Sequence, residues 1–121
     1  MFKKVAFTMY PVENMERARN FYEKTLGLTL SKVSANGAWI EYDLPGGGCF
    51  AITTLAQGVS PSHNSGGSIA FEVEDLDALV AKLKKEEVKF KLDVFASPVC
   101  RMAVIIDSEG NALTLHQIKR D

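Results

Sequence analysis

The sequence has little of the features that mark specialised classes of protein. No apolar run approaches the length of a membrane-spanning helix, and 14 basic side chains nearly balance 15 acidic ones. Neither nucleic acid nor a membrane surface is therefore an expected partner. The densest basic stretch, Lys82–Lys85 with Lys89 and Lys91, is interleaved with acidic residues, and we interpret it as the solvated face of a helix.

Cysteine is scarce as well. Cys49 and Cys100 are the only two, and they do not form a C-x-x-C pair. We expect buried thiols in a reducing compartment, since free cysteine behaves as a small hydrophobe. The apolar stretch 5–12 is too short for a signal peptide and is not followed by a small-residue cleavage site. We therefore expect a cytoplasmic protein.

The first half predicts one strand, one helix and three more strands. Residues 5–12 have strand composition, Asn14 caps the helix that follows, and Gly27 ends it. The dipeptide Asn36-Gly37 predicts a type I′ hairpin, and a looser turn follows at Pro45–Gly48. The three further strands are expected over residues 28–33, 38–44 and 49–54.

The same order of elements recurs after a Gly- and Ser-rich segment, 55–67. Asp75 caps the second helix and lies 61 positions after Asn14, close to half of the 121 residues. This spacing predicts a duplicated βαβββ unit. The expected second-half strands are 68–74, 88–95, 99–106 and 112–118.

We expect one domain over residues 1–121, with a first module over about 1–54, a linker over 55–67 and a second module over about 68–121. Each module has one helix to cover one face of a four-stranded sheet. The simplest way to cover the other faces brings the two sheets together around a cleft.

Three segments resemble the vicinal oxygen chelate superfamily, which contains glyoxalases, bleomycin resistance proteins and dioxygenases. They are NMERARNFYEKTLGL at 14–28, SIAFEVEDLDALVAKL at 68–83 and DSEGNALTLHQ at 107–117. The resemblance covers essentially the whole chain. It implies an α+β fold in which two βαβββ modules form a cupped mixed β-sheet barrel, commonly completed as a homodimer. The implied activities run from isomerisation, ring cleavage, epimerisation and thiol transfer to metal-free sequestration of drugs, and the fold does not choose among them.

The resemblance also implies where a metal would be held. Family enzymes use about three or four His, Glu or Gln ligands, one from the first and one from the last strand of each module. The matching positions here are Phe7, Ser68, Thr114 and one residue within 50–53, and none is a carboxylate or an imidazole. Phenyl cannot donate to a divalent cation, and a lone hydroxyl is a weak ligand. We therefore expect no metal and no cofactor.

Strand alternation extends this set of positions. Glu72 shares a face with Ser68, His116 with Thr114, and Glu41 with Trp39. Trp39 offers a flat apolar wall for a planar ligand, or else fills a core or a dimer interface. His63, in the linker, is solvated or covers the cleft. The full set of expected cleft residues is Phe7, Met9, Trp39, Glu41, Ser68, Glu72, Arg101, Thr114 and His116.

Three functions stay open. The first is a metal-free protein that binds a small organic ligand, which is the preferred interpretation. The second is an enzyme with a rearranged metal site or with acid–base chemistry through Glu41, Glu72 and His116. The third is a structural or regulatory module. The sequence assigns no catalytic residue, and whether the protein is an enzyme stays uncertain, with a binding protein favoured.

Overall fold

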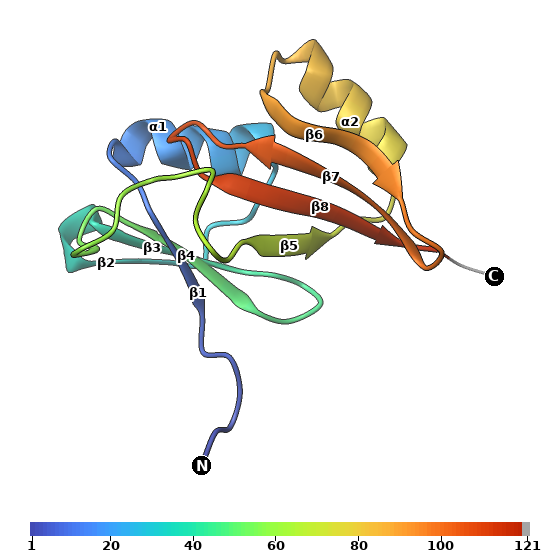
Figure 1. The fold of residues 1–121 in the computed structure, drawn as a ribbon. Coiled ribbons are helices and arrows are strands. Elements are labelled where there is room, and N and C mark those ends of the chain that lie inside the picture. The colour runs from blue at the N-terminus through green and yellow to red at the C-terminus, as the bar shows by residue number, and fades with distance from the viewer. Residues whose placement is uncertain (120–121) are drawn as a thin grey trace. The chain divides into compact units, whose positions relative to one another are not determined.

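The computed structural model describes residues 1–119 (Figure 1). The chain divides into two compact units, Met1–Pro61 and Ser62–Asp121. Each unit holds one four-stranded sheet and is described by itself.

The first unit follows the predicted order of strand, helix and three strands. Its sheet has the strand order β1-β4-β3-β2, with β1 parallel to β4 and the other neighbours antiparallel. The elements are β1 (Thr8–Pro11), α1 (Met15–Arg19), η1 (Asn20–Thr25), β2 (Lys32–Ser34), η2 (Ala35–Gly37), β3 (Trp39–Asp43) and β4 (Cys49–Thr53).

The first helix begins and ends where the sequence predicts. The Asn14 side chain accepts a hydrogen bond from the Arg17 backbone N–H at 3.0 Å, and Gly27 has a φ of 78°. Its second half, η1, is a π-helix, which the apolar spacing does not predict. Tyr22 of η1 is fully buried, with its ring centroid 5.0 Å from that of Phe50 in β4. The helix therefore covers one face of the first sheet.

The turn between β2 and β3 differs from the expected two-residue hairpin. Three consecutive residues have left-handed backbones, namely Ala35 (φ 52°), Asn36 (φ 55°) and Gly37 (φ 86°). Asn and Gly tolerate this conformation, whereas Ala35 adopts it at a steric cost. At its other end β2 starts at Lys32 and not at Leu28, whose backbone N–H donates to the Tyr22 carbonyl at the end of the helix, at 2.9 Å.

The second unit repeats the first. Its strand order is β5-β8-β7-β6, with β5 parallel to β8. The Asp75 side chain accepts from the Ala78 backbone N–H at 3.0 Å, as Asn14 does from Arg17. The α+β class and the duplicated βαβββ modules are thus confirmed. The elements are β5 (Ile69–Glu72), α2 (Leu76–Lys85), β6 (Phe90–Ala96), β7 (Cys100–Ile106) and β8 (Ala112–Ile118).

The D-S-E-G-N segment is a structural turn between β7 and β8. Asp107 is buried, and its Oδ1 accepts from the backbone N–H groups of Glu109 and Asn111, both at 2.8 Å. The Asn111 side chain accepts from the Ser62 backbone N–H at 3.1 Å. This part of the family resemblance therefore serves the fold.

In each unit the helix covers only one face of the sheet. In the second, α2 lies against the sheet (Figure 1) and contacts β7 and β8. Its own side chains Leu76 and Leu83 are fully buried. Each sheet also has two edge strands, β1 and β2 or β5 and β6, so neither sheet closes on itself. In residues 1–119 no helix has the length and apolar character needed to cross a membrane.

Candidate functional site

The helix-free face of the first sheet gathers four of the expected site residues. The register places Trp39 opposite Thr53, and it places Glu41 and Met9 on either side of Ala51. Paired residues share a face, and so do residues two apart along a strand. We call the set Phe7, Met9, Trp39 and Glu41 the aromatic face.

Trp39 is held in place from two directions. The Phe7 ring meets it edge-on at a centroid distance of 5.1 Å and an angle of 90°. Its indole Nε1 donates to Glu41 Oε2 at 2.7 Å. Phe7 is 45% exposed and Met9 37%. Within its unit, this face combines an ordered apolar surface with one carboxylate.

The two cysteines are free thiols. Burial, together with the carboxylates of Glu41 and Asp43, raises the pKa of the Cys49 thiol to about 11. Cys49 is therefore protonated at neutral pH and is a poor nucleophile. Cys100 is buried, with its sulfur 3.2 Å from the Ser97 hydroxyl.

The helix-free face of the second sheet brings Glu72 and His116 together. The two residues are opposite each other on the parallel strands β5 and β8, and His116 Nδ1 lies 2.5 Å from Glu72 Oε1. The other carboxylate oxygen, Oε2, accepts from the Ile118 backbone N–H at 2.9 Å. The carboxylate is thus anchored to the strand and orients the imidazole, as the acidic partner does in histidine dyads.

Arg101 does not join this face. It is opposite Gln117 in the register, and its guanidinium makes two hydrogen bonds to Asp77 of α2, at 3.0 and 2.5 Å. Its neighbours two and four residues on, Ala103 and Ile105, are fully buried. Arg101 therefore lies on the helix-covered side of β7, opposite to Thr114 and His116.

Ser68 and Thr114 line one small pocket of about 190 Å³ in the second unit. His63 also lines it, as does Lys91, which the charge pattern of the sequence places on a solvated helix face. Lys91 lies in β6 instead, at a register shift that leaves it as an extra residue between Phe90 and Leu92. Such a bulge interrupts the alternation of side chains, so alternation could not have placed Lys91 here.

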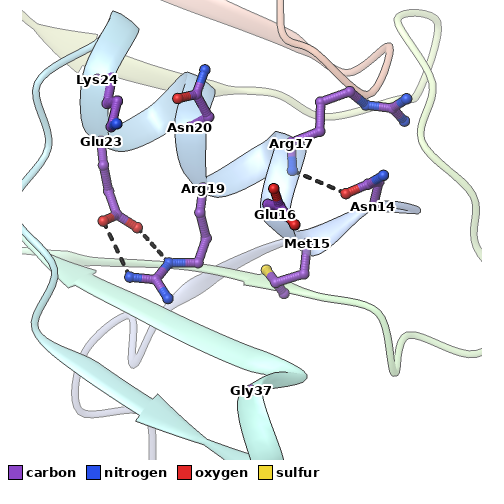
Figure 2. Close-up of a pocket in the computed structure, with 9 residues that line it drawn as sticks. All are labelled: Asn14, Met15, Glu16, Arg17, Arg19, Asn20, Glu23, Lys24 and Gly37. Carbon is purple, nitrogen blue, oxygen red and sulfur yellow. Dashed lines mark hydrogen bonds and ion pairs between the residues drawn. The ribbon is translucent and has the colours of Figure 1, made fainter.

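A larger groove of about 770 Å³ lies in the first unit, lined by α1, η1 and Gly37 (Figure 2). Figure 2 shows Arg19 and Glu23 pointing toward each other, with Arg19 Nε 2.7 Å from Glu23 Oε2. Tyr42 also donates to that oxygen, at 2.9 Å. The bond from Arg19 holds the pKa of Glu23 below its usual value, while burial raises the pKa of Tyr42. These groups satisfy one another, and we interpret them as a structural network.

The donor set does not fit a family-type divalent metal. Phe7 has no donor atom, and the Thr53 hydroxyl is engaged, donating to the Ala38 carbonyl at 2.8 Å and accepting from the Leu55 N–H at 2.9 Å. Divalent cations need carboxylate or imidazole ligands at such positions. Across residues 1–119, no three His, Cys, Asp or Glu side chains gather closely enough to hold an ion.

Solved structures share the fold. A glyoxalase/dioxygenase from Nostoc punctiforme matches with a TM-score of 0.80 and 18% identity, over 98% of this chain and 92% of that chain. TnmS3, an antibiotic binding protein from Streptomyces sp. CB03234, matches with a TM-score of 0.77 and 22% identity, over 98% of this chain and 100% of that chain. A lactoylglutathione lyase from Agrobacterium tumefaciens matches with a TM-score of 0.71 and 16% identity, over 94% of this chain and 92% of that chain.

A search of curated proteins gave no significant match. Residues 4–115 do match a family, described as the Glyoxalase/Bleomycin resistance protein/Dioxygenase superfamily, and this match spans most of the 121 residues. With the duplicated modules and the shared fold, this match shows that the chain belongs to the glyoxalase/bleomycin resistance protein/dioxygenase superfamily.

Proposed function

We propose that this protein binds a small organic ligand without a divalent metal, and that the aromatic face provides the wall against which the ligand stacks. The observation that carries the proposal is the double restraint on Trp39, by the Phe7 ring and by the Glu41 carboxylate. A side chain already fixed in its bound orientation loses little conformational entropy when a ligand arrives.

The chemistry of the aromatic face favours a planar ligand that carries a hydrogen-bond donor or a positive charge. The indole and phenyl rings supply apolar surface, and Met9 adds a polarisable side chain beside them. Glu41 uses one oxygen, Oε2, for the indole N–H, and its second oxygen can accept from a ligand. The shared fold with an antibiotic binding protein supports this interpretation without identifying the ligand.

A thermal-shift panel tests the proposal. Planar aromatic amines are added to the full chain with and without EDTA, after elemental analysis of the purified protein. We expect saturable stabilisation that EDTA leaves unchanged, because a ligand that binds only the folded state raises its stability. Stoichiometric bound metal, or stabilisation abolished by EDTA, contradicts a metal-free site.

Paired variants locate the site. Phe7→Ala removes the ring that contacts Trp39, whereas Phe2→Ala removes a ring that is fully exposed. We expect ligand stabilisation to fall in the first variant and to persist in the second. Equal losses in both contradict the aromatic face as the binding surface.

Two further parts of the proposal concern assembly and location. The family resemblance supports a homodimer, which light scattering coupled to size-exclusion chromatography tests directly. The two free thiols favour the reducing cytoplasm, where disulfides are rare.

A second candidate function is acid–base catalysis, favoured by the hydrogen bond between Glu72 and His116. An imidazole oriented by a carboxylate can take and return a proton near neutral pH. If the protein is such an enzyme, His116→Asn and Glu72→Gln abolish turnover of a bound ligand while leaving its affinity unchanged. Turnover that survives both variants excludes this candidate.

A further inference from the structure

The pocket of the second unit presents donors where the family resemblance puts metal ligands. Ser68 and Thr114 line it together with Gly66, Gly67 and Lys91. Among the described residues, no partner bonds the hydroxyl of Ser68 or of Thr114. A cavity wall with free hydroxyls can bind a guest through them.

Two carbonyl oxygens of the same loop are already in use. The carbonyl oxygen of His63 accepts a hydrogen bond from Lys91 Nζ, and that of Gly67 accepts one from the Ser65 hydroxyl at 3.0 Å. The backbone N–H groups of Gly66 and Gly67 donate to no acceptor within residues 1–119. The N–H groups of Gly66 and Gly67 and the hydroxyls of Ser68 and Thr114 are therefore available as donors to a bound molecule.

The charge of the residues that line the pocket also favours a ligand that accepts hydrogen bonds. Its lining residues include Lys91 and His63, and none of them is an aspartate or a glutamate. Lys91 Nζ is fixed by His63 and by Asn64 Oδ1, at 3.3 Å from the latter, and it keeps donor capacity beyond these two bonds. An ordered ammonium beside neutral donors suits an anion and repels a divalent cation.

We infer that this pocket binds a compact oxyanion, such as a carboxylate or a phosphate group, through Lys91, Ser68 and Thr114. The inference goes beyond the proposed function, because the pocket lies wholly within the second unit and uses none of the aromatic face. At the positions that would ligate a metal in the family's enzymes, this chain would instead hold a negative charge.

The experiment is a titration of the ¹⁵N-labelled full chain, followed by the backbone amide shifts. Inorganic phosphate and acetate are the two probes, and sodium chloride at matched ionic strength is the blank. We expect saturable shifts centred on Gly66, Gly67 and Ser68 with phosphate, acetate or both, and none with chloride. The two probes distinguish a tetrahedral from a planar oxyanion.

Three variants make the result specific. Thr114→Val removes a hydroxyl that bonds nothing within the described residues, so the sheet is expected to fold normally. Lys91→Met removes the ammonium, and Lys89→Met is its matched control because Lys89 is exposed and does not line the pocket. We expect affinity to fall about tenfold in Lys91→Met and severalfold in Thr114→Val, and to hold in Lys89→Met.

Shifts scattered over the surface, equal shifts with chloride, or equal losses in Lys89→Met and Lys91→Met overturn the inference. Unchanged affinity in Thr114→Val also overturns it as stated. This test is independent of the test of the proposed function, because binding at the aromatic face is measured with organic ligands and with the Phe7→Ala variant. Either site can fail while the other stands.

Discussion

Glu72 and His116 face each other across the parallel strands β5 and β8, with Nδ1 of the imidazole 2.5 Å from Oε1 of the carboxylate. Strand alternation predicts a shared face for Ser68 with Glu72 and for Thr114 with His116. It does not predict which residue of β5 lies beside which residue of β8. The pair carries only a small desolvation penalty, because both side chains are partly exposed to solvent. The exposed fraction is 29% for His116 and 55% for Glu72.

The first prediction concerns that pair. Glu72→Gln is expected to lower the free energy of unfolding by less than about 1 kcal/mol, because polar contacts between solvent-exposed side chains contribute little. Urea unfolding at neutral pH measures the change. A loss of several kcal/mol would show that the pair is a structural element and would weaken its candidacy as a catalytic dyad.

The second prediction concerns the two helix caps. Asn14→Ala and Asp75→Ala each remove the acceptor of one backbone N–H, with a distance of 3.0 Å in both. Each is expected to cost about 1 kcal/mol, whereas Asp75→Asn retains a capping oxygen and is the control. Similar losses in the two modules agree with their duplication. No loss in either alanine variant contradicts the capping assignment.

The third prediction concerns the turn at Asp107. This buried carboxylate accepts two backbone N–H bonds of 2.8 Å, so Asp107→Ala removes the acceptor of the buried Asn111 N–H and of the partly buried Glu109 N–H. The expected loss is about 2–3 kcal/mol of unfolding free energy, measured in urea. Ser108→Ala, in the same turn but less buried, is the comparison. Equal effects of the two variants would contradict a structural role specific to Asp107.

The fourth prediction concerns pH and the network of Arg19, Glu23 and Tyr42. The hydrogen bond from Arg19 lowers the pKa of Glu23 below its ordinary 4.5. A depressed pKa in the folded state stabilises the protein above about pH 4.5, and this contribution is lost as the pH falls through the folded pKa. Urea unfolding between about pH 3 and 7, a range that includes the titration of ordinary carboxyl groups, measures how the free energy of unfolding changes with pH.

Glu23→Gln is the matched variant for that titration. It is expected to be less stable than the wild type at neutral pH and to lose less stability on acidification. If its acid sensitivity equals that of the wild type, the network does not account for the pH dependence.

The fifth prediction concerns the thiol of Cys49, whose pKa is raised to about 11 by burial and by Glu41 and Asp43. Its alkylation by iodoacetamide is expected to be slow at neutral pH compared with glutathione, because the thiolate is the reactive form. Mass spectrometry of labelled Cys49 over a pH series gives the rate. Rapid labelling at neutral pH would show a reactive thiol.

The sequence predicted much of the fold because local signals agree with the packing. Asn14 and Asp75 identified the helix starts, and their separation of 61 residues identified the repeat. The errors have local causes. A three-residue left-handed turn takes the place of the expected two-residue hairpin between β2 and β3, and the register shift at Lys91 breaks the alternation of β6.

The candidate site could be predicted less completely. Alternation placed Trp39 with Glu41, but the Phe7 contact depends on how β1 joins the sheet through β4. The expected cleft set includes Arg101 with Thr114 and His116, but periodicity within one strand cannot show which face of that strand the helix covers. The bonds from Arg101 to Asp77 of α2 supply that information.

The central claim is best tested on Trp39, the single tryptophan of the chain. Its fluorescence is recorded while a planar aromatic amine is titrated into the EDTA-treated protein. A saturable change in emission that survives EDTA and is lost in Phe7→Ala is the predicted result. Emission that stays constant with every ligand, or changes only after a divalent metal is added, would contradict metal-free binding at this surface.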